Sequence, residues 1–298
     1  MRSSIKTLWL PTLLTAVISC NTREIRSSDF TPEFSFTKGI EGPAVNAEGT
    51  LFAVNFEKEG TIGMVDKDGK GEIYVTLPEG SIGNGIRFDK SGNMFVADYL
   101  GHKVYRFKKD LKNPEIWAQD STMNQPNDLA ISPDGTLYLS DPNWSEGTGQ
   151  LWMVTPQREL VLLETGMGTT NGIEVSRDAK NLYVNESVQR MIWKYDIQED
   201  GSVTNKTAFL SFEDFGLDGM RCDTQGNLYL TRYDKGTVLI VSPGAQILHE
   251  VQLTGKKPSN IAFGGKDGKT CFVTMADRGC VEQFKAPYPG SYFSRVNE

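Results

Sequence analysis

Short apolar runs separated by turn-forming residues recur along most of this chain. In one representative unit, a polar residue precedes an apolar run at residues 85–88, and a Gly-containing turn follows at residues 90–93. A second apolar run occupies residues 94–97, and a more clearly alternating run occupies residues 103–107. A fourth run at residues 115–117 ends the unit. Runs of this length between turn residues are typical of β-strands joined by hairpins, so the pattern predicts an all-β chain.

Six such units follow one another at intervals of 42 to 47 residues. Each begins with an oxygen-bearing polar residue; these leading residues are Glu41, Asn84, Asn127, Asn171, Asp218 and Asn260. Periods of about 40 to 50 residues built from short strands are typical of propeller blades. The sequence therefore predicts an all-β, six-bladed β-propeller with four-stranded blades.

The two ends of the chain are expected to meet in the sixth blade. Only three strands follow the start of the sixth unit, at residues 260–264, 271–275 and 280–285. The missing fourth strand is expected at residues 33–37, just before the first unit, so that an N-terminal strand closes the ring. Since no linker-like change in composition interrupts residues 33–298, they are predicted to form one domain.

The first twenty residues are expected to be an export signal rather than part of the fold. A short basic start precedes a mostly apolar stretch at residues 8–18, which is too short to span a bilayer. The stretch ends in Val-Ile-Ser-Cys20, which resembles a relaxed bacterial lipobox with Cys20 as the lipidated residue; a plain cleaved signal is the alternative. Residues 21–32 are expected to be a polar tether. These features predict a periplasmic or outer-surface lipoprotein whose only membrane contact is its lipid anchor.

Composition excludes several classes of function. The formal net charge is −7, which argues against a nucleic-acid binder because phosphate contacts need a basic face. Two His residues exclude a His-rich metal site, and four Cys residues are too few for a disulfide scaffold of this size. Cys222, Cys271 and Cys280 are expected to be buried thiols, with a Cys271–Cys280 disulfide left open.

The six leading residues all carry a side-chain oxygen, and two of them are carboxylates. Since the innermost strands of a propeller run in the same direction around the channel, their starts converge at one end of its axis. Convergent oxygens without Cys or His favour a hard cation, Ca²⁺ ahead of Mg²⁺. Asn and Asp also precede strands because they form turns, but Glu41 is not explained in that way. The sequence therefore predicts a divalent cation at the mouth of the channel.

Four motifs at blade spacing resemble those of the gluconolactonase/regucalcin (senescence-marker protein) family of six-bladed propellers. They are Glu41-Gly-Pro43, Pro126-Asn-Asp128, Asn171-Gly172 and Asp218-Gly-Met220. The resemblance covers about residues 38–285. It implies one divalent cation at the channel mouth, usually Ca²⁺, with Mg²⁺, Mn²⁺ and Zn²⁺ as other candidates.

The resemblance also implies roles for individual residues. The protein ligands of the cation would be Glu41, Asn127, Asn171 and Asp218, although the residue matching Asn127 leans toward substrate in some members. Asp218 would be the catalytic residue. Paraoxonases, which are more distant relatives, use a His near the position of Asn84, and the Asn in this chain argues against that mechanism.

The activity implied by this resemblance is the metal-dependent hydrolysis of a lactone, either a sugar lactone or a related cyclic ester. The cation would polarise the lactone carbonyl. Asp218 would activate water or attack the carbonyl directly; a bound cation lowers the pKa of a carboxylate and so makes it a poor base. An organophosphate hydrolase or arylesterase of the same superfamily, and a non-catalytic carbohydrate- or protein-binding propeller with structural Ca²⁺, are the alternatives.

Residues at the ends of the second strands are expected to form the wall of the substrate pocket. Trp144 lies in a Gly- and Ser-rich loop and is the candidate for stacking on a sugar or for a lid. Arg232 is a candidate for binding a substrate carboxylate or hydroxyl group. The predicted substrate-binding residues are Asn84, Tyr99, Asp141, Trp144, Glu186 and Arg232. A role in turns or in contacts between blades is the alternative for the wall residues.

Overall fold

The computed structural model of the chain describes residues 25–109 and 111–292. The predicted export signal and Cys20 lie outside the described residues, and they stay predictions. Within the described part of the chain, no helix is long and apolar enough to cross a bilayer.

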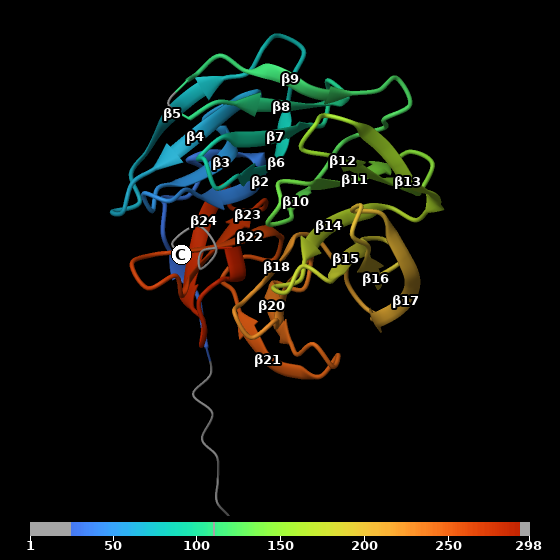
Figure 1. The fold of residues 1–298 in the computed structure, drawn as a ribbon. Helices are drawn as coiled ribbons and strands as arrows, with labels where there is room; N and C mark the ends of the chain where they lie inside the picture. The colour runs from blue at the N-terminus through green and yellow to red at the C-terminus, as the bar shows by residue number, and fades with distance from the viewer. Residues whose placement is uncertain (1–24, 110, 293–298) are drawn as a thin grey trace, which may run out of the picture.

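Six four-stranded antiparallel sheets surround a central channel (Figure 1). The first blade consists of β2 (Phe36–Val45), β3 (Leu51–Phe56), β4 (Thr61–Val65) and β5 (Gly71–Thr76). The second consists of β6 (Gly83–Phe88), β7 (Met94–Asp98), β8 (Lys103–Phe107) and β9 (Glu115–Gln119). The third consists of β10 (Leu129–Ile131), β11 (Leu137–Asn143), β12 (Thr148–Val154) and β13 (Leu160–Met167). The fourth blade consists of β14 (Thr170–Val175), β15 (Asn181–Glu186), β16 (Met191–Ile197) and β17 (Val203–Ser211). The fifth consists of β18 (Met220–Cys222), β19 (Leu228–Arg232), β20 (Thr237–Val241) and β21 (Ile247–Gln252). The sixth consists of β22 (Pro258–Gly264), β23 (Thr270–Met275), β24 (Cys280–Lys285) and β1 (Ser28–Asp29). This arrangement confirms the predicted six-bladed β-propeller.

The hydrophobic core lies between the blades. It consists of six clusters, and each cluster joins side chains of two neighbouring blades. Between the first and second blades, for example, Val54 of β3 packs with Ile86 of β6 and Val96 of β7. Inner strands are buried on both faces because a blade covers each side, whereas outer strands such as β17 are largely exposed. The ring of blade contacts therefore fixes the channel and the residues at its mouth.

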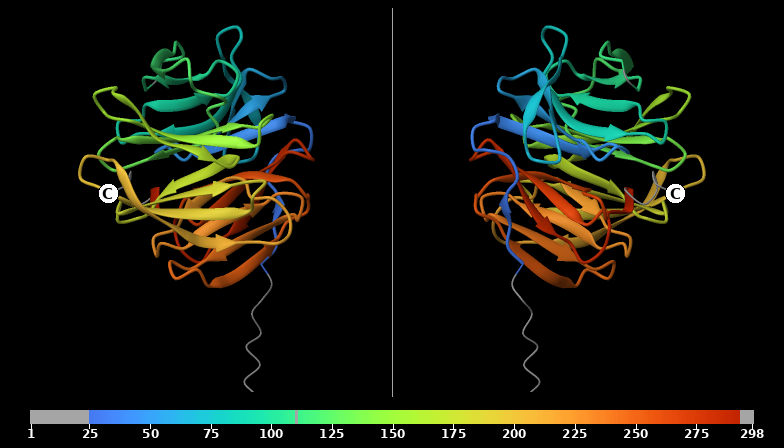
Figure 2. Two further views of the ribbon diagram at one scale, coloured as in Figure 1. Left: turned by 90° about the vertical axis from the view of Figure 1, so that its right-hand side faces the viewer. Right: turned by 90° about the vertical axis from the view of Figure 1, so that its left-hand side faces the viewer.

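An N-terminal strand closes the ring, but it lies earlier in the chain than the sequence predicted. The closing strand is β1, in which Ser28 pairs with Gln283 and Asp29 with Glu282 of β24. The expected strand at residues 33–37 is wrong, because Phe36 already begins β2 of the first blade. Figure 2 shows the N-terminal segment running beside the sixth blade before it enters the first.

The side chain of Arg278 explains why the closing strand lies at these polar residues. Its guanidinium binds Asp29 Oδ1 at 2.6 Å, Glu33 Oε1 at 2.7 Å and Glu282 Oε1 at 2.7 Å. The backbone N–H of Phe30 also donates to the carbonyl oxygen of Val281 at 2.8 Å. Part of the segment expected to be a tether is therefore held by ion pairs, which an apolar pattern could not indicate.

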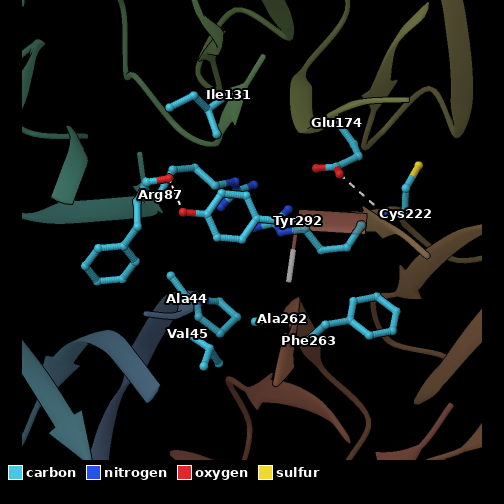
Figure 3. Close-up of a pocket in the computed structure, with 12 residues that line it drawn as sticks. Ala44, Val45, Arg87, Ile131, Glu174, Cys222, Ala262, Phe263 and Tyr292 are labelled. Atoms are coloured by element: carbon cyan, nitrogen blue, oxygen red, sulfur yellow. Dashed lines mark hydrogen bonds between the residues drawn. The ribbon is translucent and has the colours of Figure 1, made fainter. Parts of the chain in front are cut away.

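The channel ends differ in width. At the C-terminal ends of the inner strands lies a small cavity of about 40 Å³, bordered by Arg87, Glu174 and Arg221. Figure 3 shows Tyr292 reaching across this cavity, where its hydroxyl group donates to the backbone carbonyl of Phe88. At the other end, where the inner strands begin, the channel opens into a cavity of about 610 Å³.

The three described cysteines, Cys222, Cys271 and Cys280, are all buried free thiols, as the sequence predicted. The disulfide that the sequence left open does not form between Cys271 and Cys280.

Candidate metal centre

The predicted cation ligands lie where the regular pairing of the inner strands is interrupted. The register between β2 and β3 shifts at Glu41, and the register between β14 and β15 shifts between Thr170 and Ile173, around Asn171. In the third and fifth blades, β10 and β18 begin only after Asn127 and Asp218. Bulges and strand starts free a side chain from the alternation of the sheet. All four ligand candidates line the same wide cavity.

Glycine follows several leading residues because neighbouring inner strands approach closely. A Cβ atom on Gly42 would lie 2.0 Å from the carbonyl oxygen of Asn84, and the φ angle of Gly42 is 58°. A Cβ atom on Gly172 would lie 2.3 Å from the carbonyl oxygen of Asp218. At these two positions, Gly follows the polar residue because a side chain would collide with the neighbouring blade. The Gly does not belong to a hairpin turn there.

The two carboxyl groups of the site meet at the cavity floor. Glu41 Oε2 accepts hydrogen bonds from the Gly42 N–H at 2.5 Å and from Asn260 Nδ2 at 2.9 Å. The Asp218 carboxyl group interacts with Glu41 and with the side chain of Asn171, which have opposite effects on its pKa. Burial and the charge of Asp128 raise the pKa of Glu41 to about 7. Burial and the charge of Glu41 raise the pKa of Asp218 well above its usual value.

Two amide oxygens of the same cavity have no hydrogen-bond partner among the residues that the structure describes. They are Oδ1 of Asn127 and Oδ1 of Asn171, and both are buried. Buried polar atoms are normally paired, and these two unpartnered amide oxygens belong to residues that line the same cavity as the two carboxyl groups. Two repelling carboxylates and two unpartnered amide oxygens fit a hard divalent cation, which would cancel the charge and bind the oxygens.

This donor set contains only two acidic residues, and it therefore differs from a conventional acidic or His/Cys cluster. Within residues 25–109 and 111–292, no group of three or more His, Cys, Asp or Glu side chains could hold a metal ion. The candidate centre depends on amide oxygens from Asn127 and Asn171 as much as on Glu41 and Asp218. These four residues come from the third, fourth, first and fifth blades respectively.

The other two leading residues have different positions. Asn84 lines the cavity, and its Nδ2 donates to the backbone carbonyl of Asn127 at 3.1 Å. Asn260 is completely buried beneath the cavity. Its Nδ2 donates to Glu41 at 2.9 Å and to Asp128 Oδ2 at 3.3 Å, while its Oδ1 accepts from the N–H of Ile261. Asn260 therefore orients Glu41 and does not face the cavity.

Sequence reasoning missed a buried ion network in the channel below the site. Asp128 Oδ1 lies 3.1 Å from Arg87 Nη2, and Asp128 Oδ2 lies 3.1 Å from Arg221 Nη1. All three side chains are buried. Arg87 and Arg221 each stand three residues after a leading residue, inside an otherwise apolar inner strand. An Arg inside an apolar inner strand is the feature of the sequence that could have indicated this network.

Three of the predicted substrate-binding residues line the cavity: Asn84, Tyr99 and Trp144. The Trp144 side chain is 37% exposed, which leaves its ring available to a ligand. Contact of these residues with substrate stays a prediction.

The other three predicted wall residues do not line the cavity, and the prediction of their position is wrong. Asp141 is fully buried and accepts hydrogen bonds from the N–H groups of Asn124 and Gln125 and from Trp152 Nε1. Glu186 accepts a hydrogen bond from the N–H of Gly168 at 2.9 Å.

Arg232, the third of these, does not line the cavity and contacts the loop that follows β17. Its Nη2 lies 2.7 Å from Asp214 Oδ1, and its guanidinium lies 3.9 Å from the ring centre of Phe212. These are structural roles in loops and blade packing, which was the alternative for each residue.

Comparison with known proteins adds to this geometry. The family model described as "SMP-30/Gluconolactonase/LRE-like region" matches residues 40–277. A gluconolactonase from Zymomonas mobilis is 29% identical over 218 residues, which is 65% of this chain and 60% of that protein. The chain therefore spans less than two thirds of that relative. A diisopropyl-fluorophosphatase from Loligo vulgaris is 28% identical over 282 residues, which is 83% of this chain and 88% of that protein.

A solved structure shares the same fold. The calcium-binding protein regucalcin from Agrobacterium tumefaciens superposes with a TM-score of 0.77 at 17% identity, covering 89% of this chain and 97% of that one. This likeness supports the propeller architecture described above.

Proposed function

This chain belongs to the SMP-30/gluconolactonase/LRE-like family, and on that premise we propose that it hydrolyses a lactone with the help of a divalent cation. The substrate would be a sugar lactone or a related cyclic ester. The observation that carries this proposal is the convergence of Glu41, Asp218 and two unpartnered amide oxygens at the floor of one open cavity. The family match also confirms the resemblance inferred from the four sequence motifs.

The roles of the residues follow from their positions. Glu41, Asn127, Asn171 and Asp218 would hold the cation, with Ca²⁺ as the first candidate because all donors are oxygens. When bound, the cation supplies Lewis-acid polarisation of a carbonyl oxygen. Asp218 is the proposed catalytic residue: its carboxylate either accepts a proton from attacking water or attacks the lactone carbonyl itself. The side chain of Asn171 orients that carboxylate.

The cavity suits a small organic substrate. Its volume of about 610 Å³ lies within the usual range of roughly 300 to 1,000 Å³ for small-molecule sites. Aromatic rings of Tyr99, Trp144 and Tyr233 line it together with the polar groups of the centre. This combination of apolar rings and a few convergent polar groups is typical of sites that orient a sugar-sized ligand.

A second candidate function is the hydrolysis of organophosphates. It is supported by the relative from Loligo vulgaris, which aligns over more of this chain than the gluconolactonase does. Both activities would use the same centre. A panel that contains glucono-1,5-lactone, a γ-lactone, an aryl ester and diisopropyl fluorophosphate therefore decides between them by the ratio of kcat/KM values.

Removal of the cation tests the proposal directly. We expect dialysis of the full chain against EGTA to abolish lactone hydrolysis, because the proposed Lewis acid that polarises the carbonyl oxygen is then removed. Addition of Ca²⁺, Mg²⁺, Mn²⁺ or Zn²⁺ in parallel samples should restore it and identify the effective ion. Retention of the full rate in protein shown by elemental analysis to be metal-free would overturn the metal-dependent mechanism, and absence of turnover with every ion would favour a non-catalytic propeller.

A further inference from the structure

The charged side chains of the cavity do not balance once a divalent cation is bound. Five of the lining residues carry charge: Lys38, Glu41, Arg190, Asp218 and Asp234. Glu41 and Asp218 would neutralise the cation. Asp234 already has a cationic neighbour outside the cavity, since its Oδ1 lies 3.7 Å from Lys257 Nζ. In the part of the chain that the structure describes, Lys38 and Arg190 form no ion pair, so the loaded cavity carries excess positive charge.

Arg190 is held in a fixed position while one edge of its guanidinium stays free. It follows β15 in a turn of the fourth blade, and its Nη1 donates to the backbone carbonyl of Glu213 at 2.8 Å. Its Nε is buried and has no hydrogen-bond partner. The Nε–H and one Nη–H of a guanidinium point in parallel and match two oxygens of one anion. With Nη1 engaged, the edge formed by Nε and Nη2 has no hydrogen-bond partner among the described residues.

The two other cationic candidates are less suited to this role. Arg232, which the sequence favoured for binding a substrate carboxylate, is paired with Asp214 and lies outside the cavity lining. Lys38 lines the cavity from the first blade, but its side chain is exposed and its ammonium group has no fixed contact among the described residues. Arg190 combines an anchored guanidinium with an unpaired donor edge.

Apolar side chains share this part of the cavity wall. Val188 precedes Arg190 in the same turn and is 63% exposed, and Phe215 from the loop before the fifth blade is 44% exposed. Both line the cavity. Apolar walls lower the local dielectric constant, and an ion pair formed beside them is stronger than one in open water. The surroundings therefore favour binding of an anion at Arg190.

We propose that the substrate carries a second, anionic group, such as a carboxylate or phosphate, which Arg190 binds at the fourth blade, away from the reacting carbonyl. The preferred substrate would be an acidic lactone rather than a neutral one. This inference rests on the proposed lactone hydrolysis, and it assigns the specificity of that site to a residue outside the cation centre.

The test compares an anionic and a neutral lactone. For the metal-loaded full chain we expect a higher kcat/KM for glucono-1,5-lactone 6-phosphate, and for the carboxylate-bearing glucarolactone, than for glucono-1,5-lactone. R190Q should lower the ratio of anionic to neutral kcat/KM by about tenfold to a hundredfold, because a charge-assisted bidentate contact is lost. The loss should appear mainly in KM, and R190K should restore part of it. Thermal unfolding checks that each variant is folded.

A matched control is R158Q. Arg158 lies in the turn before β13, outside the cavity lining, and donates to the carbonyl oxygens of Ile116 and Trp117. The R158Q substitution removes one positive charge, as R190Q does, but at a residue outside the cavity. The ratio of anionic to neutral kcat/KM should therefore stay unchanged in R158Q. Equal kcat/KM values for anionic and neutral lactones in the wild type, or an unchanged ratio in R190Q, would overturn the proposal.

A binding experiment separates this inference from the proposed function. If no lactone is hydrolysed, the proposed function fails, and calorimetric titration with 6-phosphogluconate and with gluconate still tests the subsite. Tighter binding of 6-phosphogluconate by the wild type, reduced to the affinity of gluconate in R190Q, supports the role of Arg190. Equal affinities of the wild type for both compounds contradict it.

Discussion

At the residue scale, the chemistry of the site depends on atoms that the fold leaves without partners. Among the described residues, Oδ1 of Asn127 and Oδ1 of Asn171 are buried and have no hydrogen-bond partner. Burial and the charge of Asp128 raise the pKa of Glu41, and burial and the charge of Glu41 raise the pKa of Asp218. A buried unpaired acceptor costs about 1 to 3 kcal/mol. Two such acceptors lie together at one end of the channel, and binding of a cation there would offset this loss of stability.

Asp218 is the residue on which catalysis should depend most. We expect Asp218→Asn to lower kcat at least a hundredfold, the range usual for loss of a general base or nucleophile. Single turnover in ¹⁸O-labelled water then separates the two roles: label incorporated into Asp218 indicates direct attack, and label found only in the product indicates water activation. Asp234→Asn, which changes another carboxylate of the cavity, should have a much smaller effect. An Asp218→Asn variant with an unchanged rate would exclude Asp218 as the catalytic residue.

At the element scale, the inner strands and the closing strand have different determinants. The inner strands could be predicted from their apolar runs and their spacing, and the leading residues could be predicted to converge at one end. Closure could not be placed correctly, because β1 is only two residues long and is held by polar contacts. Ser27 and Arg278 both bind the fully buried Glu282. Contacts between polar side chains leave no trace in the pattern of apolar residues, so the sequence pattern could not predict them.

Arg278 should therefore stabilise the ring closure. Arg278→Ala would leave the buried carboxylate of Glu282 without its cationic partner, and we expect a loss of about 3 kcal/mol in the free energy of unfolding. Urea denaturation measures this value. Arg158→Ala is the control, because the Arg158–Glu115 pair is exposed and should contribute less than about 1 kcal/mol. Equal losses in the two variants would show that the Arg278 cluster does not hold the ring closed.

At the scale of the whole molecule, residues of four blades come together at the candidate cation centre. Glu41 and Asp218 are far apart in the sequence and belong to the first and fifth blades, yet both line the same cavity, and the charge of Glu41 raises the pKa of Asp218. Their shared desolvation and repulsion are absent in the unfolded chain. The pKa of Glu41 is about 7 in the folded protein and about 4.5 when unperturbed, so the folded state binds more protons between these values.

The metal-free protein should consequently become less stable as pH rises. The contribution of Glu41 is fully present below about pH 4.5 and is lost as pH rises through about 7, with an upper limit of roughly 3 kcal/mol. Unfolding free energies in EGTA at pH 5 and pH 8 measure it. The difference between the two pH values should be smaller in Glu41→Gln. A difference of the same size in both proteins would contradict the assignment of this effect to Glu41.

The sequence by itself determined the repeating blade, the number of blades and the polar residue that marks the inner strand of each repeat. These features follow from short-range patterns: apolar runs, turn residues and a constant spacing. The tertiary structure alone decided which of those residues face the cavity, since Asn84 does and Asn260 does not. It also decided that Arg190 rather than Arg232 lines the cavity, because register, bulges and contacts between blades set the direction of each side chain.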